Sequence, residues 1–288
     1  MSMSKIYIFL DGRIVYVSRR CIEPLAPGIL QAKGVFETML ACLQQAGKKD
    51  WGRPVILAFE EHMKRMEKGL RLLGIDNPFS SDSLEEIMEA LLEKNRIHKA
   101  RVRVSVWQDK QGIRSAIICQ PFYSYSKDKY IRGFSAIISS RIRKKNRFSH
   151  IKTFKYSCFY EAFAEANSSG YDEAILLNSK GELVEGARTN LFWIKNGVLF
   201  TPAVRCGCLN GITRRLIIRC ARSTGISCRA VSAGCGDLLN ADEAFLTNSL
   251  HGLMPLVRVG ADLIGSGRPG IITMRLADAY AKLLNVTI

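Results

Sequence analysis

The feature that most constrains this chain is that its apolar residues recur with two different spacings. Val102, Val104 and Val106 alternate with polar residues, which is the pattern of a half-buried strand. The segment 59–73 instead places its apolar residues three and four positions apart and stops at Gly74, as an amphipathic helix does. Because strands and helices of this kind follow one another without a regular alternation, the sequence predicts an α+β fold rather than a doubly wound sheet.

The other elements are predicted from the same patterns and from turn residues. Strands are expected at 6–10, 13–17, 101–107, 115–120, 134–139, 173–177, 191–195 and 198–200. Helices are expected within 30–41, where Gly34 weakens the pattern, and over 59–73, 157–169 and 211–222. A last helix is expected at Pro269, a residue favoured in the first turn. Ser83, with Glu86 three residues later, predicts a capping box at the start of a further helix.

The length and composition of the chain predict two domains. Its 288 residues, 47% of them hydrophobic, are enough for two packed cores. The stretch 122–132 is polar, rich in tyrosine and short of periodicity, and we interpret it as a linker. This divides the chain into an N-terminal domain of residues 1–121 and a C-terminal domain of residues 133–288.

The sequence carries no signal of export, of a membrane span or of a metal site. No signal peptide or long apolar stretch is visible, so we expect a cytoplasmic protein. The nine cysteines are odd in number and scattered, which favours reduced thiols over a disulfide framework. The four histidines form no metal-ligand pattern, and no metal is expected.

The net charge of +16 is the one unusual bulk property, and its densest run lies at 141–147. Such a run can neutralise phosphates, but no nucleic-acid motif accompanies it and no aromatic residues are interleaved with it. We therefore interpret it as a solvated surface and expect no nucleic-acid partner. A basic surface would also gather anionic substrates and an anionic cofactor.

Three candidate functional features are ambiguous when each is taken alone. Lys152, at the foot of a strand-to-helix passage, reads as one surface lysine among many, and Glu185 reads as a cap or a surface ion-pair partner. Asn210, before Gly211, reads as the N-cap of an ordinary helix. Only that helix start indicates function by physics, because its unpaired amides and its dipole attract an anion.

Taken together and in order, several segments resemble the class IV aminotransferases, the fold-type IV pyridoxal-phosphate enzymes. The segments are GVFET at 34–38, EHMKR at 61–65, IKTFKY at 151–156, GELVEGARTNLF at 181–192, TP at 201–202, LNGITR at 209–214, ADEAFLTNS at 241–249 and MP at 254–255. The family includes branched-chain aminotransferases, D-amino-acid aminotransferases and aminodeoxychorismate lyase. The resemblance implies a smaller N-terminal α/β domain and a larger C-terminal mixed β/α domain, with the cofactor between them, in a homodimer.

The resemblance gives Lys152 the catalytic role. Its amine would hold pyridoxal 5′-phosphate as a Schiff base and then move a proton between the substrate's α-carbon and the cofactor, which requires a neutral amine. Glu185 would pair with the pyridine nitrogen and keep it protonated, so that the ring acts as an electron sink. Tyr156 would donate a hydrogen bond to the phenolic oxygen of the ring.

The resemblance also assigns the phosphate site and the substrate pocket. The phosphate would be held by Arg65, by the helix start at Ile212 and Thr213, and by Ser249. The substrate, a small amino or 2-oxo acid, would meet Phe36, Trp107 and Asn248.

The sequence departs from the family at three places. Lys155 stands where the family usually has Asn; because residues i and i+3 share a helix face, it is the alternative to Lys152 for the Schiff base. Trp107-Gln108 replaces an Arg-Gly pair that helps many relatives bind the substrate carboxylate, which disfavours a D-amino-acid specificity. Ala32-Lys33 replaces a Gly-Asp pair before the segment 34–38.

Three functions stay open at this point. An aminotransferase is favoured, because that group is the broader one and the basic surface suits several anionic acids. Aminodeoxychorismate lyase, which releases pyruvate to give p-aminobenzoate, would use the same lysine, and Thr247-Asn248-Ser249 is nearer to it than to the branched-chain enzymes. The third is a catalytically silent basic binding protein on the same fold, which Lys33 and Lys155 leave open.

Overall fold

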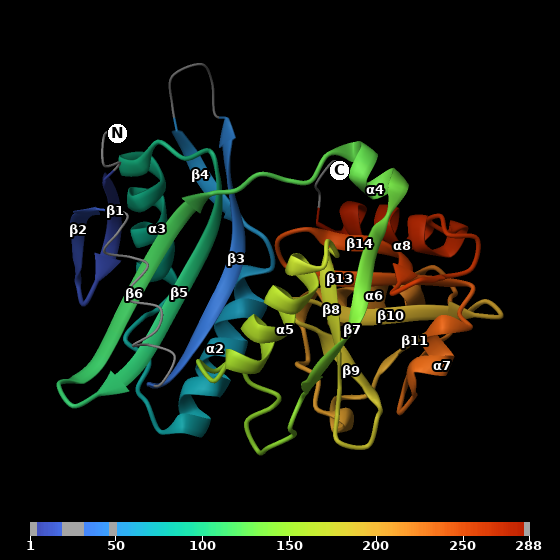
Figure 1. Ribbon diagram of the computed structural model, residues 1–288. Helices are drawn as coiled ribbons and strands as arrows, with labels where there is room; N and C mark the ends of the chain where they lie inside the picture. The colour runs from blue at the N-terminus through green and yellow to red at the C-terminus, as the bar shows by residue number, and fades with distance from the viewer. Residues whose placement is uncertain (1–4, 19–31, 46–50, 285–288) are drawn as a thin grey trace. The chain divides into compact units, whose positions relative to one another are not determined.

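The computed structural model describes residues 5–18, 32–45 and 51–284, which form two compact units (Figure 1). Unit 1 contains Met1–Tyr123 together with Ile151–Tyr156, and unit 2 contains Ser124–His150 and Ser157–Ile288. Each unit has its own sheet. The segment Ile151–Tyr156, which carries Lys152, is therefore part of unit 1 although the chain on both sides of it belongs to unit 2.

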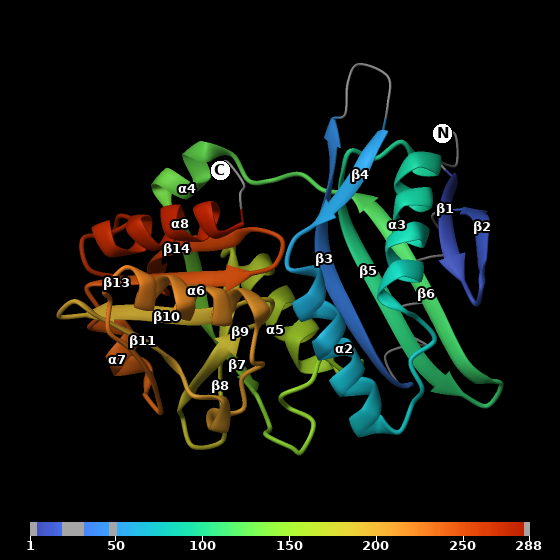
Figure 2. The same cartoon turned by 180° about the vertical axis from the view of Figure 1, so that it is seen from behind.

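Unit 1 is built on an antiparallel six-stranded sheet in the order β2-β1-β6-β5-β3-β4. The strands are β1 (Lys5–Leu10), β2 (Arg13–Ser18), β3 (Lys33–Gln45), β4 (Trp51–Ile56), β5 (Lys99–Asp109) and β6 (Gly112–Pro121). The helices α2 (Phe59–Leu73) and α3 (Ser81–Asn95) lie on one face of this sheet (Figure 2).

The helix predicted over 59–73 is confirmed as α2, and the reason is its apolar stripe. Met63, Met66, Leu70 and Leu73 are buried, while charged residues occupy the other faces. The helix ends at Gly74, whose φ of 62° lets its amide turn back to the last carbonyls. The strands predicted at 6–10, 13–17, 101–107 and 115–120 are confirmed as β1, β2, β5 and β6.

The helix predicted within 30–41 is wrong for the residues that the structure describes. They belong to the long strand β3, which pairs with β5 from Lys33↔Gln108 to Cys42↔Lys99. A continuous apolar run is compatible with a buried strand or with a buried helix, and periodicity cannot separate them. The non-local pairing with β5 decides for the strand.

Unit 2 is built on a mixed sheet, in the order β12-β11-β10-β13-β14-β7-β8-β9 with β15 beside β14. Its strands are β7 (Phe134–Ile142), β8 (Glu173–Leu177), β9 (Leu183–Gly186), β10 (Asn190–Lys195), β11 (Val198–Pro202), β12 (Cys228–Val231), β13 (Glu243–Asn248), β14 (Gly252–Val259) and β15 (Asp262–Leu263). Its helices are α4 (Lys127–Arg132), α5 (Ser157–Ser168), the 3-10 turn η2 (Val204–Cys206), α6 (Ile212–Ser223), α7 (Cys235–Leu239) and α8 (Ile271–Leu283).

Most elements predicted in this part are confirmed, within a few residues at their ends: β7, β8, β10, β11, α5, α6 and α8. The strand β9 was not predicted, because the buried carboxylate of Glu185 interrupts its apolar run. The strands β12, β13 and β14 were not predicted either. The stretch 122–132, interpreted as a linker, contains α4 in its second half.

Two predicted helix starts are wrong. In α3 the N-cap is Ser80, whose hydroxyl accepts from the Ser83 amide at 3.1 Å, so Ser83 is the third helical residue and completes the capping box itself. In α8 the N-cap is Gly270 and the helix begins at Ile271, so Pro269 lies before the first turn rather than in it. In both cases the capping geometry moves the start by two or three residues.

Within the described residues, no helix is long and apolar enough to cross a membrane. The eight cysteines of that part of the chain are free thiols, and Cys21 lies outside the described residues. The same residues contain no group of three or more His, Cys, Asp or Glu side chains that could hold a metal ion.

Candidate active site

Lys152 is fixed to the edge of the unit 1 sheet. Along one edge of β3, β4 pairs from Ala41 onward. Nearer the start of β3, the segment 151–156 lies along the same edge and is joined to it by a Val35↔Thr153 bridge. The Phe36 amide donates to the Lys152 carbonyl at 3.0 Å, and the Phe154 amide donates to the Gly34 carbonyl at 3.3 Å. Lys152 is therefore held by main-chain hydrogen bonds rather than carried on a free loop.

Gly34 is what allows this segment to approach. A Cβ at this position would lie 2.4 Å from Cε2 of Phe154, 2.6 Å from Cβ of Trp107 and 2.6 Å from the Val106 carbonyl oxygen. No side chain fits such a space, so the close packing of the lysine segment against β3 requires glycine here.

The amine of Lys152 lies between aromatic groups. Its Nζ donates to the Tyr156 hydroxyl at 3.3 Å and lies 4.6 Å from the centre of the Phe36 ring. The structure thus brings together three predicted site residues of unit 1. Lys155 is exposed, and neither it nor Lys152 is helical, so the helix-face argument for Lys155 as the alternative is wrong.

Arg103 is a candidate functional residue that the sequence reasoning missed. Its guanidinium carbon lies 4.1 Å from the centre of the same Phe36 ring, and its Nε donates to the Ser105 hydroxyl at 3.4 Å. Ser105 is the β5 residue directly opposite Phe36 in the sheet. The alternating pattern of β5 indicated a polar face, but it could not show that this face carries a second cation to the ring of Phe36.

Trp107, predicted to line the substrate pocket, is part of a buried aromatic cluster. It is buried with Phe36, Ala116 and Phe154, and Tyr156 packs against this cluster. The Trp107 and Phe154 rings meet edge to face, with their centres 6.5 Å apart. The cluster gives the surroundings of Lys152 a rigid, apolar character.

Arg65, predicted to hold a phosphate, projects from α2 onto the buried Glu37 of β3. Its Nε and Nη2 donate to the two carboxylate oxygens at 2.7 and 2.6 Å. His62, also on α2, lies with Nδ1 2.7 Å from Oε2 of the same carboxylate. Burial raises the pKa of Glu37, but Arg65 and His62 outweigh it and bring the value to about 2.

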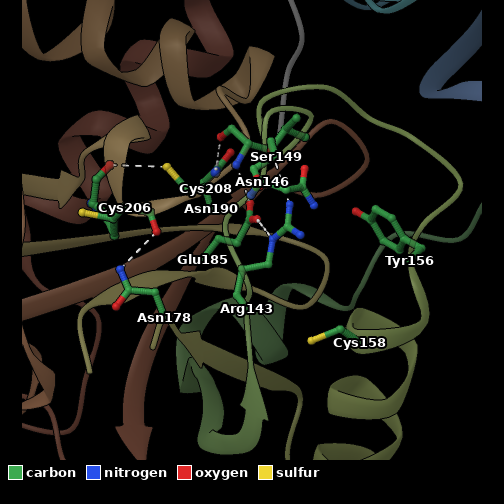
Figure 3. Close-up of polar contacts among 12 residues, drawn as sticks. Arg143, Asn146, Ser149, Tyr156, Cys158, Asn178, Glu185, Asn190, Cys206 and Cys208 are labelled. Atoms are coloured by element: carbon green, nitrogen blue, oxygen red, sulfur yellow. Dashed lines mark hydrogen bonds and ion pairs between the residues drawn. The ribbon is translucent and has the colours of Figure 1, made fainter. Parts of the chain in front are cut away.

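Glu185, in unit 2, is a buried carboxylate on β9 (Figure 3). Its Oε2 accepts from the Leu209 amide at 2.9 Å, and its Oε1 lies 3.7 Å from Nε of Arg143, an ion pair without a hydrogen bond. Arg143 was interpreted as part of a solvated basic run. Its side chain is only 13% exposed, and its guanidinium packs 4.7 Å from the centre of the Phe159 ring.

The start of α6 is attached to Glu185 through Leu209. While Glu185 accepts from the Leu209 amide, the carboxamide of Asn190 donates to the Leu209 carbonyl at 2.9 Å. A Cβ on Gly211 would lie 2.0 Å from Oδ1 of Asn190, so glycine is required at this position. The buried carboxylate and the helix start are thereby linked through Leu209. Figure 3 shows Asn190 beside Glu185.

The N-terminus of α6 has no side-chain cap. The N-cap is Gly211 rather than the predicted Asn210, and it makes no side-chain capping bond. Oδ1 of Asn210 instead accepts from Arg214 at 3.2 Å. The first turn contains no acidic residue, and its first two residues, Ile212 and Thr213, are buried. Such a turn offers uncapped amides to a negatively charged group.

Asn248 and Ser249 lie at the end of β13 in unit 2. Oδ1 of Asn248 accepts from the amides of Leu250 and His251, at 3.0 and 2.8 Å, and so stabilises the turn into β14. Ser249 is partly exposed in this turn. The predicted site residues therefore fall into two groups: Phe36, Arg65, Trp107, Lys152 and Tyr156 in unit 1, and Glu185, Ile212, Thr213, Asn248 and Ser249 in unit 2.

Comparison with known proteins identifies the family. The model of the family described as Amino-transferase class IV matches residues 34–259. The chain belongs to the class IV aminotransferases. It is 30% identical to the probable branched-chain-amino-acid aminotransferase of Aquifex aeolicus, covering 97% of this chain and 92% of that protein. It is 28% identical to the branched-chain-amino-acid aminotransferase of Pseudomonas aeruginosa, covering 96% and 92%.

Among solved structures, the T.th. branched-chain amino acid aminotransferase with pyridoxamine 5′-phosphate matches with a TM-score of 0.85 and 25% sequence identity. The match covers 98% of this chain and 95% of that one. The family match confirms the aminotransferase prediction, and the branched-chain aminotransferases among the relatives support it over the lyase.

Proposed function

We propose that Lys152 is the catalytic lysine of a pyridoxal-phosphate-dependent aminotransferase that moves an amino group between an amino acid and a 2-oxo acid. Class IV aminotransferases use pyridoxal phosphate. The observation that carries the assignment is the fixed position of Lys152, with its carbonyl bonded to Phe36 and its amine beside the Tyr156 hydroxyl. Lys155, exposed and outside that arrangement, is not proposed for this role.

The residues present fit the cofactor by the chemistry of their donor set. A primary amine next to a phenol, a buried carboxylate and an uncapped helix start match an aldehyde with its phenolic oxygen, a pyridine nitrogen and a phosphate. In this proposal Tyr156 holds the phenolic oxygen and Glu185 holds the ring nitrogen. The residues that would hold the phosphate are Arg65, Ile212, Thr213 and Ser249.

The chain's own groups supply proton control and orientation. When bound, the cofactor withdraws electrons from the substrate's α-carbon. The Lys152 amine acts as the base that takes and returns the α-proton. The Glu185 carboxylate, buried and fixed by the Leu209 amide, keeps a proton on the ring nitrogen. The aromatic cluster of Phe36, Trp107 and Phe154 excludes water near the amine.

We propose branched-chain amino acids as the substrate class. The relatives described above are branched-chain aminotransferases by name. The aromatic cluster beside Lys152 suits an aliphatic side chain, and the Arg103 guanidinium suits a carboxylate. We further propose that the enzyme is a cytoplasmic homodimer, which size-exclusion chromatography with light scattering and cell fractionation would check.

The test is an absorbance spectrum of the purified protein followed by turnover with amino donors. The proposal expects a yellow protein that converts leucine, isoleucine or valine only when a 2-oxo acid is supplied. D-amino acids serve as the specificity control. Pyruvate release from aminodeoxychorismate without a second substrate would contradict the aminotransferase proposal, and a colourless protein that takes up no cofactor would contradict the role of Lys152.

A further inference from the structure

The strongest unexplained feature of unit 1 is the buried group formed by Glu37, His62 and Arg65. Glu37 is 1% exposed and His62 is fully buried, although both are ionisable. His62 and Arg65 are three residues apart on α2, which places them on one face of the helix toward β3. All three contacts to the carboxylate are 2.6 to 2.7 Å long.

The charges of this group are set by its own contacts. With a pKa of about 2, Glu37 is ionised and can only accept hydrogen bonds. Burial lowers the pKa of His62 against the opposing effect of Glu37, and the charges of Arg65 and Lys152 lower it further. His62 is therefore neutral and donates from Nδ1.

Glu37 uses only one side of the Arg65 guanidinium. A guanidinium has five N–H groups, and the pair of hydrogen bonds from Nε and Nη2 takes the side fork. The end fork, made by Nη1 and the second Nη2 hydrogen, points away from Glu37. A phosphate or carboxylate can accept from such a fork through two oxygens.

We propose that Glu37 is a positioning residue that aims Arg65 at the phosphate of the cofactor. The carboxylate accepts both hydrogen bonds of the side fork, and His62 holds the carboxylate in place. The end fork of the guanidinium is thereby oriented for two hydrogen bonds to the phosphate. This inference rests on the proposed function, in which Arg65 binds that phosphate. Glu37 itself touches neither cofactor nor substrate.

The alternative role for Glu37, neutralising the charge of Arg65, predicts the opposite change in phosphate affinity. If the carboxylate served only to neutralise the Arg65 charge in the core, its removal would leave a stronger positive charge and would tighten phosphate binding. If it positions the guanidinium, its removal lets the fork turn away and weakens phosphate binding. The sign of the change therefore separates the two roles.

The experiment compares pyridoxal phosphate with pyridoxal, which lacks the phosphate, in the full-length protein stripped of cofactor. The dissociation constants of both are measured by absorbance titration for the parent chain and for Glu37→Gln. Glutamine keeps the size of the side chain, but it removes the negative charge and replaces one of the two accepting oxygens by an NH2 group, which can only donate. We expect the constant for pyridoxal phosphate to rise about tenfold or more, as for a lost charge-assisted hydrogen-bond pair, and that for pyridoxal to stay within about twofold.

Asp11→Asn is the matched control. Asp11 forms an Arg–carboxylate pair of the same sheet, with Arg114, and has no place in the proposed site. It has a φ of 45°, which asparagine tolerates well. We expect this variant to keep both dissociation constants. An equal loss in the control would show that any broken ion pair of unit 1 weakens binding, and would overturn the inference.

Glu37→Asp keeps the charge while it draws the carboxylate back by one methylene, and it tests the inference if the glutamine variant does not fold. We expect a selective loss of pyridoxal phosphate affinity of about threefold or more, because geometry rather than charge has changed. Unchanged or tighter phosphate-specific binding in a folded variant overturns the role of Glu37 and leaves the proposed function standing. A parent chain that binds neither compound overturns the proposed function itself.

Discussion

The amide of Phe36 donates a 3.0 Å hydrogen bond to the carbonyl oxygen of Lys152. This bond joins two residues that are far apart in the sequence, and it aligns the lysine segment with the first residues of β3. The ring of Phe36 then lies 4.6 Å from the lysine amine. The same residue therefore fixes the backbone of Lys152 and forms part of the surroundings of its reactive atom.

Replacing Lys152 by alanine should abolish both the yellow absorbance and the transamination activity, because the amine that binds the cofactor is lost. The fold should survive, since the main-chain bonds to β3 do not depend on the side chain. Lys155→Ala is the control, because Lys155 is exposed, and it should stay yellow and active. Spectra, turnover and circular dichroism check this, and a yellow, active Lys152→Ala variant would refute the assignment.

Gly34→Ala should loosen the lysine segment. The added methyl group would meet Phe154, Trp107 and the Val106 carbonyl within 2.6 Å, and over-packing of this kind costs about 1 to 3 kcal/mol of unfolding free energy. Gly236→Ala adds the same methyl group into open space and should cost nothing. Urea unfolding and cofactor titration of both variants measure the difference; equal behaviour would show that the close approach at Gly34 is unimportant.

Asn190→Ala should weaken the link between the Glu185 carboxylate and the start of α6. It removes the 2.9 Å hydrogen bond to the Leu209 carbonyl, which should lower the unfolding free energy by about 1 to 2 kcal/mol and reduce affinity for pyridoxal phosphate. Asn240→Ala removes a comparable bond to the Gly236 carbonyl at an exposed helix end and should have little effect. Matching losses in both variants would speak against a special role of Asn190.

Arg103→Met should raise the KM for the amino-acid substrate about tenfold or more while the protein stays yellow, because a cation that holds the carboxylate is lost and the cofactor contacts are kept. Steady-state kinetics with leucine and absorbance spectra check both parts. Arg114→Met, which removes a cation paired with Asp11 on the same sheet, is the control. An unchanged KM in the Arg103 variant would exclude this residue from substrate binding.

Acid should destabilise the parent chain partly through Glu37. Its pKa falls from 4.5 to about 2 on folding, so the stabilisation is present above pH 4.5 and is lost as the pH falls toward 2. The shift corresponds to about 3 kcal/mol. In urea unfolding at a series of pH values, the stability advantage of the parent over Glu37→Gln should shrink between pH 5 and the lowest value at which the protein folds. A constant difference would contradict the lowered pKa.

Local sequence patterns were enough to predict the elements whose buried residues recur with a single helix or strand spacing. The helix α2 and the strand β5 follow from their own residues, because each buries a regular stripe or alternating row. β3 could not be predicted in this way. Its apolar run fits a helix as well as a strand, and only its pairing with β5 decides.

The same distinction between local patterns and non-local contacts applies to the candidate site. The sequence by itself determined the family: an ordered set of short motifs resembles the class IV aminotransferases, and that resemblance points to Lys152, Glu185 and the α6 start as site candidates. It could not show that Arg65 is held by Glu37, or that Arg103 reaches the ring of Phe36. Those relations join residues from different strands and helices. Only the tertiary structure decided them, because hydrogen bonds and ring contacts depend on distances that sequence separation does not encode.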